Sequence, residues 1–320
     1  MRRVLVALAW AWWLAAAGLT ALRWVDAVGP VPVLQSGLVL VGLSLVPLAV
    51  LAWALARRLL LGAAVLLGLG HAALAAPWLL PDTVPAGRDD LVIATANLEY
   101  GRGSLADLAA MVDEREVDAL VLVEMTPEAQ ARLEGSALDR ALPVRAGTLR
   151  SDAGGTLVLT REGMAGSADD ETGADGAHVI DEPYLFDQVR LPITWGGQTV
   201  TLLGAHTRPP AVAGSAAWRE ELGWLGEDAT GIEGPLLVVG DLNASTGHPA
   251  LRQVKDDAGL RDAHEASGSG WVRTWPTEGL LPAFVQIDHV LVRGLDVVDA
   301  GAATVTGSDH AAVWARLRLP

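Results

Sequence analysis

Three long apolar runs, at about residues 4–22, 36–56 and 59–80, open the chain. None of them contains an acidic residue, lysine or arginine, and each is close to the roughly 20 residues that a helix needs to cross a bilayer core. Several tryptophans stand near the ends of the runs, as interfacial tryptophans do. The pattern predicts a membrane anchor over residues 1–80 with three transmembrane helices, followed by a linker over residues 81–90.

Arginines predict how this anchor is oriented. Arg2 and Arg3 precede the first run, and Arg57 and Arg58 separate the second from the third. Positive charges flank membrane spans on the cytoplasmic side, so the N-terminus is expected in the cytoplasm and everything after the third span outside it. A cleaved signal peptide is the alternative for the first run, but no convincing small-x-small cleavage site precedes Arg23 and two further runs follow. The expected localisation is a multi-pass protein of the cell membrane, with the lipid bilayer as a partner.

Beyond residue 90 the pattern changes to short apolar runs separated by segments of helical periodicity. Runs typical of buried strands cover residues 91–96, 119–123, 155–161, 186–193, 199–204, 236–239 and 286–292. Helices are expected over residues 105–115, where Ser104 can cap the first turn, and over residues 211–229. Gly196-Gly197 predicts a hairpin between two of the strands. Because hairpins occur among the helices, the pattern favours a two-sheet α/β sandwich over residues 91–320 rather than a doubly wound parallel sheet.

Polar residues of metal-binding or acid/base type follow the apolar strands. They are Asn97, Glu124, His206, Asp241, Asn243, Asp288, Asp309 and His310. Asp241 and Asn243 stand two residues apart after an uninterrupted apolar run, and residues two apart in an extended segment share a face. Gly, Asp and Asn are also common turn residues, so this motif alone leaves a turn open. Strand ends that meet at one edge of a sandwich are nevertheless where such a fold builds a site.

The residue types suggest metal-dependent chemistry on a phosphoester. Glu124 and Asp309, with Asn97, offer the oxygen ligands that Mg²⁺ or Mn²⁺ prefers. His206 and His310 are candidates for acid/base work or for holding phosphate oxygens. Each residue also has a structural alternative, such as an arginine partner for the glutamate or a turn for Asp309.

Three further side chains complete the expected site. Asp288 can accept a hydrogen bond from a histidine ring and so fix its tautomer. Asn243 can donate its amide to a phosphate oxygen, and Asp241 can position a water molecule.

Charge and composition narrow the partners. The net charge of −15 is uneven, because residues 1–87 carry +3 and residues 88–320 carry −18. A domain this acidic repels a polyanion, so nucleic acid is not the expected substrate. The chain has no cysteine, which excludes disulfides, zinc–thiolate sites and a cysteine nucleophile.

Seven sequence blocks, in order along residues 88–320, resemble the signature blocks of the endonuclease/exonuclease/phosphatase superfamily. They are ATANLEYG, VLVEMTPE, GAHTRPP, VVGDLNAS, RTWP, QIDHVLV and GSDHAAV. This superfamily includes deoxyribonuclease I, abasic-site endonucleases, neutral sphingomyelinases and inositol-polyphosphate phosphatases. The resemblance implies a deoxyribonuclease I-like sandwich and metal-dependent phosphoester hydrolysis. The membrane-anchored layout also resembles the glycopeptide-resistance-associated membrane proteins of the superfamily.

The resemblance further implies a role for each matched residue. Asn97 is the active-site asparagine of the first strand, Glu124 the principal metal ligand and Asp309 a further ligand. His206 and Asn243 contact the phosphate, Asp241 and Asn243 act on the water, and Asp288 orients His310. His310 itself is the acid/base or phosphate-contacting histidine. Leu242 and Thr207 depart from the usual Phe and Leu of their blocks, which affects neighbours of the site rather than its chemistry.

The sequence therefore predicts a membrane-anchored phosphatase or phosphodiesterase with Mg²⁺ or Mn²⁺ as cofactor. Its expected substrate is a lipid-linked or a small phosphoester outside the cytoplasm, with polyprenyl phosphates within reach. An extracellular nuclease and a non-catalytic, membrane-tethered binding protein are the alternatives. No obligate protein partner is expected.

Overall fold

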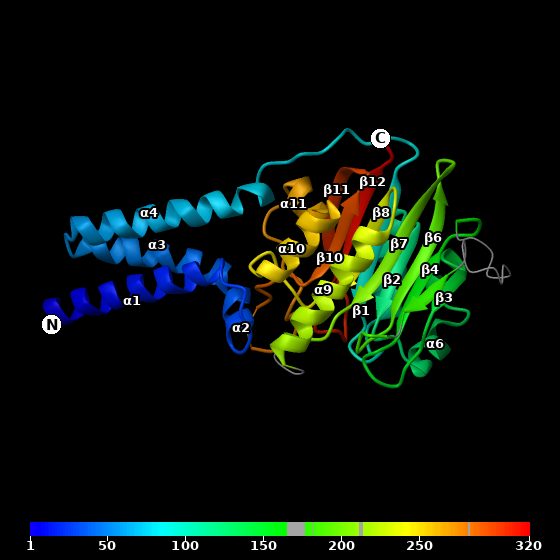
Figure 1. The fold of residues 1–320 in the computed structure, drawn as a ribbon, viewed down its shortest axis with the longest axis horizontal. Helices are drawn as coiled ribbons and strands as arrows, with labels where there is room; N and C mark the ends of the chain where they lie inside the picture. Colours follow the sequence, from blue (N-terminus) through cyan, green and yellow to red (C-terminus); the bar gives the residue numbers. More distant parts are fainter. Residues whose placement is uncertain (165–176, 181, 211–213, 281) are drawn as a thin grey trace.

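A computed structural model describes residues 1–164, 177–180, 182–210, 214–280 and 282–320. Figure 1 shows two parts along the long axis of the molecule. A bundle of long helices from the N-terminal quarter projects from a globular part built on stacked sheets. The segment between them, residues 79–90, has no helix or strand and runs along the globular part, where Asp82 and Val84 donate backbone hydrogen bonds to Ala266 and Val297.

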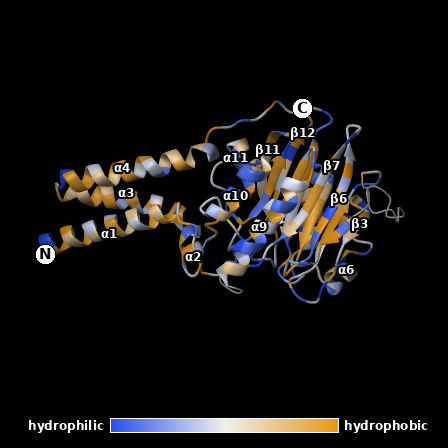
Figure 2. Cartoon of the chain, viewed as in Figure 1, coloured by the Kyte–Doolittle hydropathy of each residue, from blue (hydrophilic) through white to orange (hydrophobic). Residues whose placement is uncertain are grey.

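The bundle owes its form to apolar residues on every side of its helices. Its elements are α1 (Arg2–Leu22), α2 (Val31–Ser36), α3 (Leu38–Ala54), α4 (Arg58–Ala75) and η1 (Ala76–Trp78). Leu48 and Leu60 are fully buried where the helices pack, yet Leu40, Val46 and Leu66 on the outside are exposed. Figure 2 shows apolar residues along the length of the bundle. A helix that is apolar all round suits lipid rather than water.

The prediction of three spanning helices is wrong in number among the described residues. Two helical segments, Arg2–Leu22 and Arg58–Trp78, are long and apolar enough to cross a membrane. The expected span at 36–56 corresponds to the 17-residue α3, which begins after Gly37 and is shorter than the other two helices. Pro47 lies within α3, where it removes one backbone hydrogen bond.

Two six-stranded sheets form the globular part. The first has the order β11-β12-β1-β2-β4-β3, and the second has the order β5-β6-β7-β8-β10-β9. The strands of the first are β1 (Leu91–Asn97), β2 (Ala119–Val123), β3 (Val144–Gly147), β4 (Thr156–Thr160), β11 (Asp296–Thr304) and β12 (Ala311–Arg318). Those of the second are β5 (His178–Ile180), β6 (Gln188–Trp195), β7 (Gln198–His206), β8 (Leu236–Asp241), β9 (Arg261–Asp262) and β10 (Asp288–Arg293). The two-sheet sandwich is confirmed, and so is the hairpin at Gly196-Gly197 between β6 and β7.

Three apolar clusters hold the sandwich together. Alternate residues such as Ile93, Val121 and Leu237 meet between the sheets. The outer face of the first sheet packs on α5 (Leu105–Arg115), α6 (Pro127–Leu133) and α7 (Ala137–Ala141). The outer face of the second packs on α9 (Ser215–Gly231) and α10 (Pro249–Ala258), while α11 (Ala263–Ser267) lies near β11. The fold is therefore four layers deep, with helices on the outer face of each sheet.

Both predicted helices form. Ser104 caps α5 as expected, and its hydroxyl accepts a hydrogen bond from the Asp107 amide. The helix expected over residues 211–229 corresponds to α9, although its residues 211–213 lie outside the described part of the chain.

Candidate active site

The alternation of inward-facing and outward-facing residues along each strand explains why polar residues gather at one edge of the sandwich. On β1 the residues Leu91 and Ile93 face the core between the sheets, and two further steps of two lead to Asn97. The same alternation runs from Leu237 and Val239 to Asp241 on β8. The inward face of β8 is apolar up to Asp241, and that of β1 carries Thr95 before it ends in Asn97.

Pairing between strands then sets these ends side by side. His206 of β7 lies opposite Asp241 of β8, and Asp241 lies opposite Asp288 of β10. Gly240 permits the close approach of β7, because a Cβ there would collide with the carbonyl oxygen of Ala205. On the other sheet, Asn97 pairs with Val123, so Glu124 follows at the same level.

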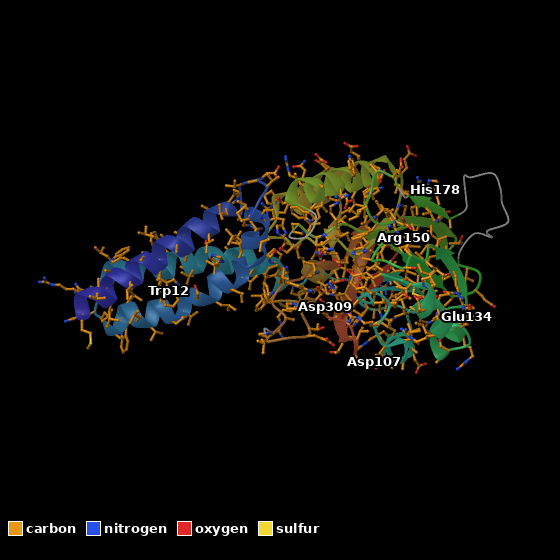
Figure 3. All side chains as sticks on the ribbon, turned by 90° about the horizontal axis from the view of Figure 1, so that it is seen from below. Trp12, Asp107, Glu134, Arg150, His178 and Asp309 are labelled. Carbon is orange, nitrogen blue, oxygen red and sulfur yellow. The ribbon has the colours of Figure 1, made fainter. Side chains whose placement is uncertain are left out.

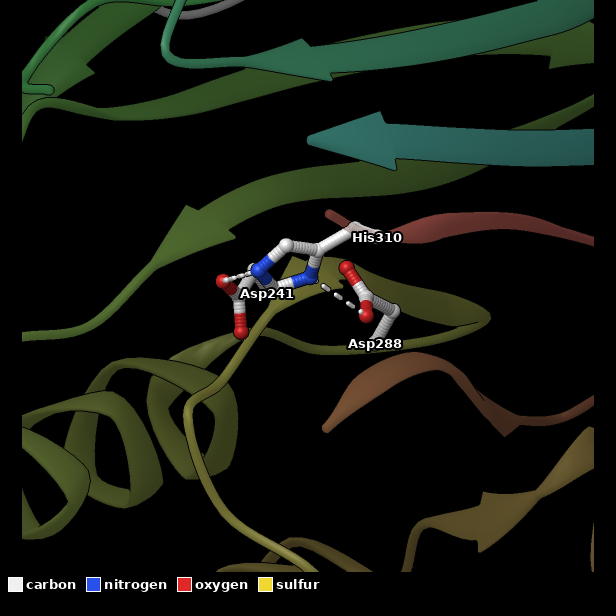
Figure 4. A group of neighbouring side chains, drawn as sticks. All are labelled: Asp241, Asp288 and His310. Atoms are coloured by element: carbon white, nitrogen blue, oxygen red, sulfur yellow. Dashed lines mark hydrogen bonds and ion pairs between the residues drawn. The ribbon is translucent and has the colours of Figure 1, made fainter. Parts of the chain in front are cut away.

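Asp241, Asp288 and His310 form the centre of the site (Figure 4). His310 Nδ1 donates to Asp288 Oδ2 at 2.9 Å, and its Nε2 lies 3.8 Å from Asp241 Oδ2. Burial lowers the pKa of His310, but the negative charges of Asp288 and Asp241 outweigh it and raise this pKa to about 10. The imidazole is therefore held as a buried cation between two carboxylates at neutral pH.

His206 is in the opposite protonation state. Burial, together with the positive charge of His310, lowers the pKa of His206 to about 3. Its ring stacks on Phe186 with centroids 4.3 Å apart, and its Nε2 lies 3.8 Å from Asp241 Oδ2. The site thus offers one neutral and one charged histidine on either side of Asp241, and the charged ring can neutralise negative charge on a substrate.

Asp241 is held by two asparagines. Asn97 Nδ2 donates to its Oδ2 at 3.1 Å, and the backbone amide of Asn243 donates to its Oδ1 at 2.8 Å. Burial and the charge of Asp288 raise the pKa of Asp241. Its carboxylate is therefore fixed in orientation and is a stronger base than an exposed aspartate.

Glu124 contributes to the same site from the first sheet, which faces the sheet that carries Asp241. Its Oε1 accepts a hydrogen bond from Asn97 Nδ2 at 3.0 Å, and its Oε2 accepts one from the Tyr100 amide at 2.7 Å. Burial raises its pKa, while the charges of His310 and Asp309 also reach it. Asn97 therefore links Glu124 to Asp241, and its own amide oxygen already accepts from the backbone of Glu99 at 2.8 Å.

Asp309 is positioned by a tryptophan. Its Oδ2 accepts a hydrogen bond from the Trp275 indole at 2.9 Å, and its Oδ1 lies 3.7 Å from His310 Nε2. Ser308 anchors the preceding turn, since its hydroxyl donates to the carbonyl of Asn97 at 2.7 Å. The structure thus brings all eight sequence-predicted residues to one edge of the sandwich.

Backbone strain is concentrated at this edge. Six non-glycine residues with positive φ occur among the described residues, and four of them belong to this site: Glu99, Tyr100, Glu124 and Asn243. Such conformations are costly for residues with a Cβ and persist where the surrounding structure over-determines them. Asn243, at φ 46°, uses its side-chain amide to donate to the carbonyl of Thr207 at 2.8 Å.

The donor set fits a divalent cation. The carboxylate oxygens of Asp241 and Asp288 and a ring nitrogen of His310 lie within 4.8 Å of one another and could hold a metal ion. The Nδ1 hydrogen bond and the positive charge of His310, however, occupy that ring, which makes it a poor ligand. Glu124 and Asp309 supply the partly open carboxylates of the site, and oxygen donors of this kind suit Mg²⁺ or Mn²⁺.

Several supporting residues were not identified from the sequence. Trp275 of the RTWP block holds Asp309, and Thr274 beside it accepts hydrogen bonds from the amides of Ile287 and Asp288. His289 is buried and bonded to Asp262 at 2.6 Å, with the carbonyl of Ala244 at its other ring nitrogen. The RTWP block could have indicated the first pair, whereas no sequence signal joins Asp262 to His289, which stand 27 residues apart.

A family model matches the part of the chain that carries this site. The model described as "Endonuclease/Exonuclease/phosphatase family" matches residues 94–310, which include all eight residues of the site. The chain belongs to the endonuclease/exonuclease/phosphatase family. Members of this family are phosphoesterases and nucleases that depend on divalent metal ions.

Solved structures share the fold at low identity. TDP2 of D. rerio, complexed with a single-strand DNA product, matches with a TM-score of 0.58 at 16% identity over 72% of this chain and 100% of the other. The mannosyl-6-phosphatase of Bacteroides thetaiotaomicron matches with a TM-score of 0.53 at 17% identity over 71% and 99%. An endonuclease/exonuclease/phosphatase family protein of the same organism has a TM-score of 0.54 at 16% identity over 74% and 97%. A comparison with curated proteins gave no match.

The surroundings of Leu242 and Thr207 explain how the site accommodates these two departures from the usual sequence blocks. Leu242 is fully buried in the apolar cluster beneath α9 and α10, so the slot of the usual phenylalanine stays apolar. Thr207 is also buried, and its hydroxyl donates to the carbonyl of Leu242 at 2.5 Å. Both residues therefore support the loop that carries Asn243 without entering the site.

Proposed function

We propose that this protein is a membrane-anchored, metal-dependent phosphoester hydrolase whose active site faces away from the cytoplasm. The observation that carries the proposal is the pairing of a cationic His310 with a neutral His206 around Asp241. A phosphoryl group needs positive charge on its oxygens and a base for the attacking water, and this arrangement provides both.

Each residue has a definite part in the proposed mechanism. His310, fixed by Asp288, donates from Nε2 to a phosphate oxygen and offsets charge in the transition state. Asp241, fixed by Asn97, accepts a proton from the attacking water, and His206 beside it stays neutral. Glu124 and Asp309 would hold Mg²⁺ or Mn²⁺, and Asn97 would orient Glu124 rather than bind the ion itself. When bound, such an ion polarises the phosphoryl oxygen and stabilises the leaving oxygen.

The anchor and its orientation follow from the ends of the bundle. Arg2 donates a hydrogen bond from Nη2 to the carbonyl of Leu55 at 2.9 Å, which places the N-terminus beside the turn that carries Arg57 and Arg58. This end of the bundle lies away from the globular part (Figure 1). Clustered arginines mark the cytoplasmic end, so the globular part would lie across the membrane from it. In this arrangement α1 and α4 span the bilayer, and the 17-residue α3, at the short end of the length that a span needs, would cross between them.

The substrate class follows from charge and position. A globular part that carries most of the −18 charge of residues 88–320 disfavours nucleic acid, although one similar structure holds a DNA product. A lipid-linked or small phosphoester at the membrane surface is the substrate that this protein would meet, and a polyprenyl phosphate is one such lipid.

Removal of divalent metal tests the proposed chemistry. The full chain in detergent, with Mg²⁺ present, is expected to release phosphate or alcohol from a panel of lipid and small phosphoesters. Chelation by EDTA should lower the rate by about 100-fold or more, and added Mg²⁺ or Mn²⁺ should restore it, because charge stabilisation at the phosphoryl group is lost with the ion. A rate that EDTA leaves unchanged, or no hydrolysis of any ester, would contradict the proposal.

Reporter fusions test the orientation. Alkaline phosphatase, which is active only outside the cytoplasm, is expected to be active when it is fused after Pro320 and inactive when it is fused after Arg57. A cytoplasmic reporter should show the reverse pattern. Activity of the phosphatase at Arg57 would place the arginine end of the bundle outside and overturn the proposed topology.

A further inference from the structure

A cavity of about 300 Å³ lies at the junction of the bundle and the globular part. One wall is apolar and comes from α3 and α4, including Leu38, Val39, Leu43 and Leu74. The opposite wall comes from the globular part, at residues 245–247 and 284–286. The cavity is at the lower end of the range of about 300–1,000 Å³ in which proteins bind small molecules. None of its residues takes part in the chemistry described above.

The polar end of this cavity carries cationic charge. Arg23 lines the cavity and donates from Nη1 to the carbonyl of Thr246 at 2.7 Å, while Arg252 donates to the carbonyls of Arg23 and Thr246 at 2.5 and 2.9 Å. No carboxylate of the described residues lies within salt-bridge distance of either guanidinium. Glu265 also lines the cavity, but its carboxylate is paired with Lys255.

Burial lowers the pKa of both arginines, that of Arg252 to about 10. The charges of Glu265 and Asp256 act on Arg23 and Arg252 respectively, but neither carboxylate forms an ion pair with them. Two adjacent, partly desolvated cations without an ion-pair partner favour an anion. The indole N–H of Trp78, which also lines the cavity, is buried without a partner among the described residues. The cavity therefore offers both charge and an unused donor.

The cavity is also linked to the active site through the backbone. The loop that begins at Asn243 in the site contributes Ser245 to the cavity wall two residues later. Gln286 contributes to the wall two residues before Asp288. Along the long axis, Asp309 lies nearer to the bundle than Glu134 and His178 do (Figure 3). A molecule held at the junction would thus reach toward the catalytic edge.

We propose that this cavity binds the head-group end of a membrane lipid that carries a phosphate ester. The first part of the lipid chain lies against the apolar wall of α3 and α4, and the phosphate lies toward Arg23 and the Trp78 indole. The volume holds only this part of the lipid, so the remaining chain stays in the bilayer beside the bundle. This inference rests on the proposed function and deepens it, because it selects lipid phosphoesters over small soluble ones as substrates.

Photolabelling tests the site. The full chain is placed in phosphatidylcholine nanodiscs with a small fraction of phosphatidic acid that carries a diazirine near the head group. Labelled peptides are then identified by mass spectrometry. Label is expected on the cavity-lining turns of α3 and α4. Gly68→Leu should reduce it by about tenfold or more, since Gly68 lines the cavity and a side chain there meets open space.

Matched variants separate the cavity from the rest of the bundle. Gly70→Leu, on the same helix but outside the cavity lining, is expected to leave labelling unchanged. Arg23→Gln should also reduce labelling by about tenfold, because a charge-assisted contact is lost. Arg219→Gln, which breaks the junction ion pair with Asp26, should not reduce it. Equal labelling of the wild type, Gly68→Leu and Arg23→Gln would overturn the proposal.

Two further measurements, competition by inorganic phosphate and labelling of an inactive variant, distinguish a lipid site from a free-phosphate site and from the active site. Protection from labelling by inorganic phosphate as effective as that by unlabelled phosphatidic acid would show a site for free phosphate and overturn the lipid assignment. Labelling is also measured in the His310→Asn variant, because binding does not require turnover. If no ester is hydrolysed but the cavity is labelled, the proposed function fails and the lipid site stands. If esters are hydrolysed without labelling of the cavity, the lipid site fails alone.

Discussion

Glu124→Gln is expected to lower kcat for phosphoester hydrolysis by about 10²–10³-fold, the effect of removing one charged group aimed at the reacting centre. The substitution keeps the shape of the side chain, and its carbonyl oxygen can still accept from the Tyr100 amide, as Oε2 does now at 2.7 Å. What it removes is the negative charge that would hold the divalent ion, together with the acceptor of one hydrogen bond from Asn97 Nδ2. A higher Mg²⁺ concentration should therefore recover part of the rate.

The fold should survive this change. Glu124 is a desolvated carboxylate whose burial raises its pKa, so replacing it with a neutral isostere removes a costly buried charge. The unfolding temperature is expected to be equal to that of the wild type or higher. Glu134→Gln is the matched control, since Glu134 is exposed and lies away from the site (Figure 3). A Glu124→Gln enzyme with a wild-type rate and wild-type metal dependence would remove Glu124 from the ligand set.

The part of this site that can be predicted from the sequence follows from which residue ends each buried strand. Buried strands are recognised by their apolar runs, and the residue that ends each run must lie on the edge of the sheet. The positions of Asn97, Asp241 and His206 at one edge could therefore be predicted from the amino-acid sequence, because each terminates an apolar strand. Pairing of β7, β8 and β10 then makes neighbours of residues that the sequence separates by dozens of positions.

Other features depend on contacts that no local pattern encodes. The bond from Trp275 to Asp309 joins residues 34 apart, and the bond from Asp262 to His289 joins residues 27 apart. The second apolar run forms α3, which is shorter than the predicted span because hydropathy alone does not show at which residues a helix begins and ends. The cavity at the junction needs the relative placement of the bundle and the sandwich, which periodicity within one segment cannot supply.

His310→Asn is expected to lower kcat by about 10³-fold, within the range for removal of a positioned acid/base group. Asn keeps a hydrogen-bond donor near Asp288 but carries no charge. The buried cation that faces Asp241 at 3.8 Å is lost, and with it the neutralisation of negative charge on the phosphoryl oxygens. KM should change much less than kcat, because this charge matters most in the transition state. His178→Asn, at an exposed histidine, is the control and should keep the wild-type rate.

The pair formed by Asp288 and His310 makes this prediction sharper. Asp288 acts through the ring, to which it is bonded at 2.9 Å, so Asp288→Asn should lower kcat less than His310→Asn does. Once His310 is gone, Asp288 has no ring to orient, and the double variant should be no slower than His310→Asn alone. Additive losses in the double variant would instead show that Asp288 contributes to the reaction independently of the His310 ring. The double-variant cycle therefore decides whether Asp288 serves the reaction through His310 or separately from it.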